Sequence, residues 1–239
     1  MTLDFNRVAE NPMSDQLNAA LDRAFKGRDE ESRHYLGASF IGADCQRQIQ
    51  FDWMCDSEHP AQLQNIFERG HFFEEQTRQQ LKAAGFKFRP GIHGFSVADN
   101  MFRGHADGII DDGPTLYGIT YPCLWEHKAL GQNGWRSIER DGLNKAYPKY
   151  AAQVAIYQAY LDVTTPALFT VTNANDCRRL HIAVPFNAER AQAWSDRAVA
   201  IIKATQAGQL LEGVADDPKD WRCMMCSHKQ RCYPELKTS

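Results

Sequence analysis

The chain has no uninterrupted apolar run that approaches the roughly 20 residues needed for a membrane-spanning helix, so we expect no membrane segment. Its first ten residues carry two acidic side chains and lack an apolar signal core, which favours a cytoplasmic protein over a secreted one. The sequence also lacks internal repeats and low-complexity linkers. At 239 residues, the chain is expected to form one large domain with at most a small appendage.

The chain also lacks a large excess of charge of either sign. Its formal net charge is −3, and its hydrophobic and charged fractions of 43% and 24% are ordinary for a soluble globular protein. This balance argues against a protein that coats nucleic acid nonspecifically, although a basic groove can exist on an acidic protein.

Cysteine is scarce, and its seven residues are an odd number, which argues against a disulfide framework. Cys223, Cys226 and Cys232 form a compact ligand set in a polar tail. One further thiolate completes four-coordination, which suits either zinc or a [4Fe–4S] cluster. An oxidoreductase that uses such a cluster for electron transfer is the weakest interpretation, because the chain has no glycine-rich nucleotide-binding fingerprint and no second cluster motif.

The pattern of apolar and turn residues predicts an α/β fold, with a central mixed sheet flanked by helices. Helices are expected in the ranges 14–25, 37–54, 61–84, 135–161 and 188–211. Strands are expected in the ranges 86–88, 95–97, 104–110, 116–129, 167–172 and 179–185. This division predicts a polar lead over residues 1–36, a core over 37–212 and a cysteine-bearing tail over 213–239.

Three charged side chains lie in two neighbouring apolar strands of this prediction. Asp107 is in the first strand, and Glu126-His127-Lys128 ends the second. Pairing of the strands brings Asp107 close to Glu126, and Lys128 lies on the face of Glu126 because side chains two apart point the same way. Two carboxylates beside a lysine form a hard-cation site with a water activator, as phosphodiester cleavage requires. A surface hairpin with solvated charges also explains the spacing, but charges embedded in apolar strands are costly unless they are paired or bind metal.

These residues resemble the motif of the PD-(D/E)xK nuclease superfamily, which implies a restriction-endonuclease-like core. The resemblance implies that Asp107, Glu126 and the backbone carbonyl of His127 bind Mg²⁺ or Mn²⁺. It also implies that Lys128 orients or deprotonates the attacking water and offsets charge on the phosphate. Asp107, Glu126 and Lys128 are thus the expected catalytic residues.

Two further elements resemble the RecB-like branch of this superfamily. Gln153 and Tyr157 lie one helical turn apart, and in that branch such a pair contacts DNA near the metals. An ordinary amphipathic helix explains the same spacing. Upstream, Glu74 occupies the slot where the branch has a metal-binding histidine, and it is a sound hard-cation ligand. His71, one turn earlier, is more typical of a surface or packing histidine.

The cysteine layout is similar to that of CRISPR-associated exonucleases with an iron–sulfur cluster, which have one cysteine before the nuclease core and three after it. The resemblance implies a structural [4Fe–4S] cluster held by Cys45 together with Cys223, Cys226 and Cys232, so that the tail closes back on Cys45. Cys55 is the alternative first ligand, and Zn²⁺ is the alternative to the cluster.

Basic residues also lie between the Glu-x-Lys strand and the Gln-x-x-x-Tyr helix, with aromatic residues among them. Arg136 and Lys149 are the expected DNA contacts, because cations and aromatic faces suit single-stranded DNA, but a solvated helix face explains the run equally well. The combined resemblance implies a metal-dependent DNA exonuclease that acts on single-stranded or frayed ends, beside recombination, CRISPR-adaptation or viral DNA-processing proteins. The alternative from another class is a DNA-end-binding or assembly protein of the same fold without turnover.

Overall fold

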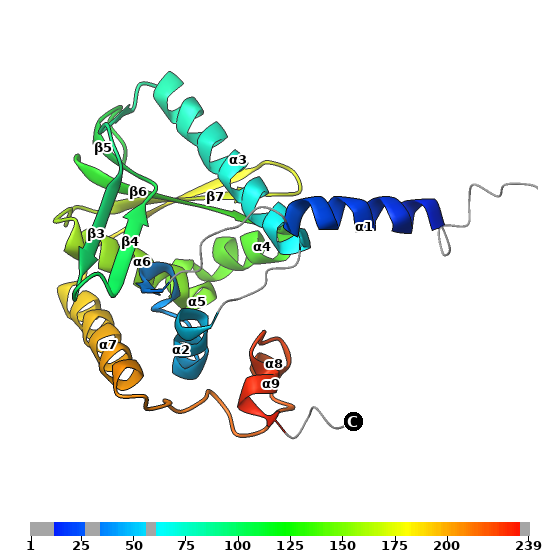
Figure 1. Ribbon diagram of the computed structural model, residues 1–239. Coiled ribbons are helices and arrows are strands. Elements are labelled where there is room, and N and C mark those ends of the chain that lie inside the picture. The colour runs from blue at the N-terminus through cyan, green and yellow to red at the C-terminus, as the bar shows by residue number, and fades with distance from the viewer. Residues whose placement is uncertain (1–11, 27–33, 56–60, 235–239) are drawn as a thin grey trace, which may run out of the picture.

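The computed structural model describes residues 12–26, 34–55 and 61–234 of the chain (Figure 1). Helices surround two β-sheets, one of five strands and one of three, so the predicted α/β class is confirmed. Within the described ranges, no helix is both long enough and apolar enough to cross a membrane.

The larger sheet has the strand order β2-β5-β6-β7-β8 and mixes parallel with antiparallel pairs. β6 and β7 run parallel, which requires a long crossover connection, and three helices supply it. Every residue of β7 is buried, as expected for a central strand covered on both faces. The strands of this sheet are β2 (Lys87–Phe88), β5 (Gly108–Asp112), β6 (Cys123–Leu130), β7 (Ala167–Asn173) and β8 (Arg179–Val184).

The smaller sheet has the order β1-β4-β3 and lies beside the larger one. The sequence predicted a single strand over residues 104–110, and that prediction is wrong. The run is broken at Asp107, which separates β4 in the smaller sheet from β5 in the larger one. The strands of the smaller sheet are β1 (Leu36–Gly37), β3 (His93–Val97) and β4 (Phe102–Ala106).

Helices cover the two faces of the larger sheet (Figure 1). α3 (Ala61–Ala83) packs against β6 on one face, where Trp125 belongs to the smaller apolar cluster. α6 and α7 pack on each other, and α6 covers the opposite face, where Leu124 belongs to the main core. The helices of the crossover and of the second layer are α4 (Gln132–Asp141), α5 (Leu143–Ala146), α6 (Pro148–Tyr160) and α7 (Ala188–Gln206).

Several predicted boundaries differ from the structure. The strand expected over 116–129 begins only at Cys123, and the helix expected over 135–161 is divided into α4, α5 and α6. The helix expected over 37–54 begins only at α2 (Gln46–Met54), because the residues before it form β1, pair with β4 and continue into a short 3₁₀ turn (Ala38–Phe40). The helix expected to reach residue 211 ends at Gln206, and Gly208 follows in the left-handed region with φ of 68°.

The tail after α7 carries two short helices, α8 (Trp221–Met224) and α9 (Lys229–Cys232), which lie to the right of α2 in Figure 1. The ring of His228 is buried and lies 2.7 Å from Asp52 Oδ1 of α2. Arg47 Nε donates a hydrogen bond over 2.7 Å to the carbonyl of Leu211. α2 therefore contacts the tail at two places, at Leu211 near its start and at His228 between α8 and α9.

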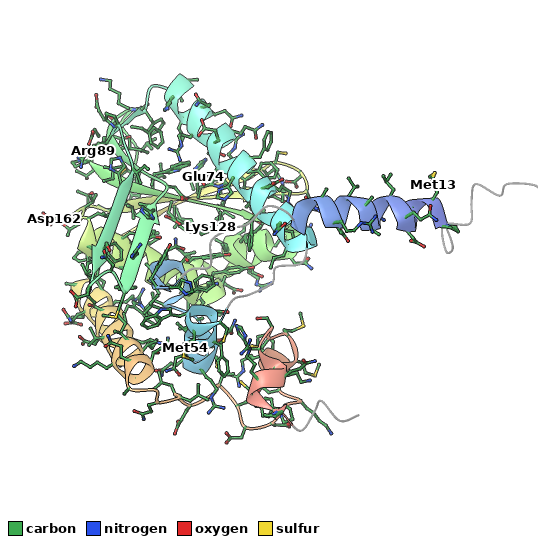
Figure 2. The ribbon with its side chains drawn as sticks, viewed as in Figure 1. Met13, Met54, Glu74, Arg89, Lys128 and Asp162 are labelled. Carbon is green, nitrogen blue, oxygen red and sulfur yellow. The ribbon has the colours of Figure 1, made fainter. Side chains whose placement is uncertain are left out.

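The N-terminal helix α1 (Pro12–Lys26) extends away from the rest of the molecule (Figures 1 and 2). It is the amphipathic helix predicted near residues 14–25, although its apolar side chains Met13, Leu17 and Leu21 are exposed. Residues 1–11 of the predicted polar lead lie outside the described ranges.

Candidate active site

Asp107 lies at the point where the chain passes from one sheet to the other. The antiparallel register of β5 on β6 pairs Gly108 with Trp125, so the residue before Gly108 falls beside Glu126. The backbone N–H of His127 donates a 2.7 Å hydrogen bond to Asp107 Oδ2. The break between β4 and β5 thus fixes a carboxylate against the Glu-x-Lys segment.

Glu126 is the most deeply buried carboxylate of this site, with its side chain 1% exposed. Its Oε1 accepts hydrogen bonds from Lys128 Nζ and from Gln153 Nε2, the latter over 2.7 Å. Its Oε2 is buried and has no hydrogen-bond partner among the described residues. Burial, and after it the charge of Asp107, raises the pKa of Glu126 to about 8.

Lys128 projects from the same face of β6 as Glu126 and lies with its Nζ 5.5 Å from the ring centre of Tyr150. Burial lowers the pKa of Lys128, but the charges of Glu126 and Asp107 outweigh it and raise the pKa overall. Lys128 is therefore a protonated cation in this arrangement, held against the buried carboxylate.

Glu74 reaches the same site from α3. Arg78 Nη2, one helical turn on, lies 2.6 Å from Glu74 Oε1, and the exposed His71 lies 3.7 Å from Oε2. Burial, and after it the charge of Asp107, raises the pKa of Glu74. Three carboxylates from α3, the β4–β5 break and β6 therefore repel one another.

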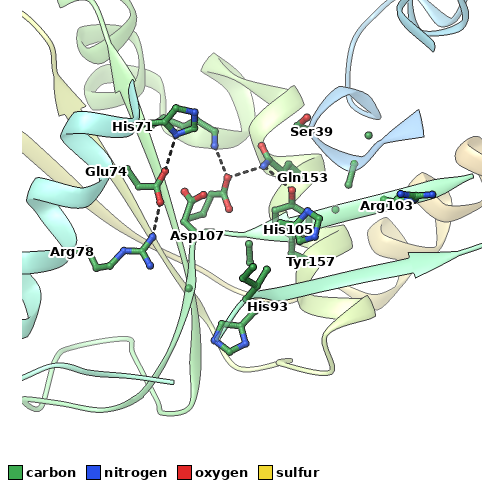
Figure 3. Close-up of a pocket in the computed structure, with 18 of the residues that line it drawn as sticks. Ser39, His71, Glu74, Arg78, His93, Arg103, His105, Asp107, Gln153 and Tyr157 are labelled. Atoms are coloured by element: carbon green, nitrogen blue, oxygen red, sulfur yellow. Dashed lines mark hydrogen bonds and ion pairs between the residues drawn. The ribbon is translucent and has the colours of Figure 1, made fainter. Parts of the chain in front are cut away.

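A cavity of about 460 Å³ joins these groups (Figure 3). In the close-up, Glu74 and Asp107 point toward one another, and Gln153 and Tyr157 lie on the far side of Asp107 from Arg78. Glu126, Lys128 and His71 also line the cavity. The sequence predicted that Gln153 and Tyr157 contact DNA. Both are almost fully buried but line the cavity, and their hydrogen bonds are with Glu126 and with each other, because α6 packs beneath β6.

Two predicted DNA contacts lie away from this cavity. Arg136 is exposed on α4, and its charge acts on Asp176 in the β7–β8 turn. Lys149 Nζ lies 4.8 Å from the ring centre of Phe40, and burial lowers the pKa of this lysine. Neither residue lines the cavity that holds Asp107 and Glu126.

The donor set of the cavity fits a hard cation by its chemistry. No three His, Cys, Asp or Glu side chains in the described ranges are arranged ready to hold an ion, because Lys128 and Arg78 occupy the carboxylates of Glu126 and Glu74. The unpartnered Glu126 Oε2 and the mutual repulsion of the carboxylates are both relieved by a divalent cation. The predicted ligands Glu74, Asp107, Glu126 and the carbonyl of His127 therefore fit Mg²⁺ or Mn²⁺.

A second cavity, of about 360 Å³, lies between α2, the start of α6 and the tail. Cys45, Cys223, Cys226 and Cys232 all line it, whereas Cys55, Cys123 and Cys177 do not. Burial raises the pKa of Cys226, and the charges of Cys232 and Cys45 add to the rise. Four cysteines thus line one cavity, and thiolates are the ligand type of zinc and iron–sulfur sites, although no three of these side chains are arranged ready to hold a metal ion.

Sequence reasoning missed two contributions to the site. Arg78 follows Glu74 by four residues, and that spacing on a helix is a signal for an ion pair. The side chain of His127 contacts Thr172 Oγ1 at 2.8 Å and Thr77 Oγ1 at 3.4 Å, so it links α3, β6 and β7. Nothing in the sequence predicts these contacts of His127, because they depend on how α3 packs on the sheet.

No protein-family model and no curated protein sequence matches the chain. Among solved structures, the alkaline exonuclease LHK-Exo from Laribacter hongkongensis has a TM-score of 0.51 at 14% identity, over 80% of this chain and 93% of its own. LHK-Exo in complex with dAMP has a TM-score of 0.50 at 16% identity, over 73% and 89%. The structure of SSO0001 covers 95% of this chain and 98% of its own at 14% identity, with a TM-score of 0.46. The LHK-Exo structures show that this chain shares the fold of that alkaline exonuclease.

Proposed function

We propose that the chain is a metal-dependent nuclease that hydrolyses phosphodiester bonds at DNA ends. One observation carries the proposal: the carboxylates of Glu74, Asp107 and Glu126 converge with Lys128 in one cavity. The chain has the fold of an alkaline exonuclease that was also solved with a bound mononucleotide, dAMP. Three carboxylates and a lysine are groups that can bind the metal ion and position water in metal-assisted hydrolysis of a phosphodiester.

Glu74, Asp107, Glu126 and the carbonyl of His127 are the groups that would hold Mg²⁺ or Mn²⁺. When bound, the ion supplies Lewis acidity and activated water. Lys128, which is held against Glu126, is placed to orient or deprotonate the attacking water and to offset phosphate charge. The hydrogen bond that Gln153 donates to Glu126 holds this carboxylate in its orientation at the cavity.

The size of the cavity favours single-stranded or frayed ends as the substrate. A volume of about 460 Å³ is in the range of small-ligand sites and has room for a short piece of one strand. His71, Arg103 and His105 line the same cavity and offer side chains that suit a polyanion.

We also propose that Cys45, Cys223, Cys226 and Cys232 hold a structural [4Fe–4S] cluster, with Zn²⁺ as the alternative. The convergence of these four thiols in one cavity supports the assignment. Protein purified without oxygen is expected to be brown with broad visible absorbance. A colourless protein with stoichiometric zinc favours the alternative.

The test is a cleavage assay on end-labelled single- and double-stranded DNA with Mg²⁺, Mn²⁺ or EDTA. The proposal expects metal-dependent release of nucleotides by the wild-type protein and none by Lys128→Ala. Binding of DNA ends by the wild-type protein without release of nucleotides supports the assembly-protein alternative instead. Full cleavage by purified Lys128→Ala contradicts the catalytic assignment.

A further inference from the structure

Arg78 has contacts that a purely structural ion pair does not require. Its guanidinium lies 2.6 Å from Glu74 Oε1 at the wall of the active-site cavity. The same group lies 5.4 Å from the ring centre of Trp125 and 5.9 Å from that of Phe88. Its Nε lies 3.3 Å from Oε2 of the exposed Glu75, in an ion pair without hydrogen-bond geometry. Two aromatic faces thus hold a guanidinium that lies between one carboxylate at the cavity and one outside it.

Two cations stand beside the carboxylates that the proposed function assigns to the metal. Lys128 pairs with Glu126, and Arg78 pairs with Glu74 (Figure 3). A cation that pairs with a ligand carboxylate must release it, at least in part, when a divalent ion takes that carboxylate. The released lysine or arginine side chain then remains inside the cavity, next to any other ligand of the ion.

We infer that Arg78 is a second catalytic cation of this site, which pairs with Glu74 before metal binding and with the scissile phosphate afterwards. The inference rests on the proposed nuclease function. A phosphate oxygen that shares an ion with Glu74 lies beside this carboxylate and therefore within reach of the guanidinium. The planar fork of arginine matches two phosphate oxygens, and it neutralises charge without a proton transfer.

The geometry also distinguishes Arg78 from the other arginine that forms an ion pair at this wall. Arg89 lines the cavity too, but its guanidinium is held 2.6 Å from Asp111 Oδ1 at an exposed strand edge. Asp111 is not among the carboxylates assigned to the metal, so metal binding does not release Arg89. The control for Arg78→Gln is Arg140→Gln, because the exposed Arg140 of α4 lies 2.6 Å from Asp141 and does not line the cavity.

The experiment measures two quantities on each purified variant: Mn²⁺ affinity without DNA, by electron paramagnetic resonance of free Mn²⁺, and kcat on end-labelled DNA at saturating Mn²⁺. For Arg78→Gln the inference predicts Mn²⁺ binding about threefold tighter, because a competing cation is gone. It predicts kcat about 100-fold lower, because a donor to the transition state is lost. Arg140→Gln is expected to leave both quantities within twofold of wild type.

The opposite results overturn the inference. Weaker Mn²⁺ binding, with cleavage restored at high Mn²⁺, means that Arg78 only orients Glu74. Unchanged kcat means that Arg78 does not touch the phosphate.

If Arg78→Gln does not fold, Arg78→Lys is the test variant. Its kcat should fall at least about tenfold, because lysine lacks the planar guanidinium that binds two phosphate oxygens, and an unchanged kcat overturns the inference. An inert wild-type protein contradicts the nuclease proposal itself, whereas an active wild type beside a fully active Arg78→Gln contradicts this inference alone.

Discussion

The side-chain amide of Gln153 donates a hydrogen bond to Glu126 Oε1 over 2.7 Å, and both side chains are buried. This contact joins α6 to β6 beneath the active-site cavity. It gives the Gln-x-x-x-Tyr helix a role in holding Glu126, a proposed metal ligand, in place.

Replacement of Gln153 by methionine is expected to lower the free energy of unfolding by about 2 kcal/mol, because a buried charged acceptor loses a donor. Urea denaturation in EDTA measures the change. The control is Gln192→Met, since Gln192 donates to Asp196 on the exposed face of α7, and its effect should stay within about 0.5 kcal/mol. Equal effects of the two substitutions argue against a special role of the Gln153 contact.

Asp107→Asn is expected to stabilise the metal-free protein by about 0.5 to 1 kcal/mol and to abolish cleavage. The charge of Asp107 raises the pKa of Glu126 and of Glu74, so its removal relieves repulsion. The asparagine oxygen can still accept the hydrogen bond from the His127 N–H. Asp111→Asn breaks the half-exposed pair with Arg89 and should lower stability by at most about 1 kcal/mol. Destabilisation by Asp107→Asn of more than this control contradicts the repulsion argument.

The same substitution at two glycines should change stability with opposite sign. A Cβ at Gly42 comes within 2.6 Å of both Lys149 Cα and Ala152 Cβ, so Gly42→Ala forces α6 away and should cost about 1 to 3 kcal/mol. A Cβ at Gly70 meets nothing within 4 Å, and this glycine lies inside α3. Gly70→Ala should therefore stabilise by about 0.5 to 1 kcal/mol in thermal or urea unfolding. A neutral Gly42→Ala shows that the close approach of residue 42 to α6 does not exist.

Cys45→Ser tests whether a bound cluster or zinc ion links α2 to the tail, as we propose. Serine preserves the N-cap of α2, where Cys45 Sγ accepts from the Gln48 N–H, so a loss of stability reports on the proposed cluster and not on the cap. Loss of visible absorbance or bound metal is expected, with a destabilisation on the order of 5 kcal/mol because the link closes a long loop. Cys177→Ser, at an exposed cysteine, should change neither. Equal metal content in Cys45→Ser and wild type means that Cys45 is not a ligand of the metal or cluster.

The sequence predicted the parts of the fold that depend on local patterns and on pairing of neighbouring strands. The α/β class follows from alternating helix and strand patterns, and the approach of Asp107 to Glu126 follows from the pairing of β5 with β6. The break of the 104–110 run was not predictable, because β4 and β5 have continuous strand-like patterning and separate only by joining different sheets. The burial of Gln153 and the contacts of His127 with Thr77 and Thr172 depend on how α6 and α3 lie on the sheet, which residue spacing does not encode.

The most direct test of the central claim is the anomalous scattering of Mn²⁺ in crystals grown or soaked with that ion. The account predicts one strong peak at least, in contact with a carboxylate oxygen of Asp107, one of Glu126 and the carbonyl of His127, with the amine of Lys128 displaced from Glu126. A map in which Mn²⁺ avoids these oxygens, at concentrations that support cleavage, contradicts it.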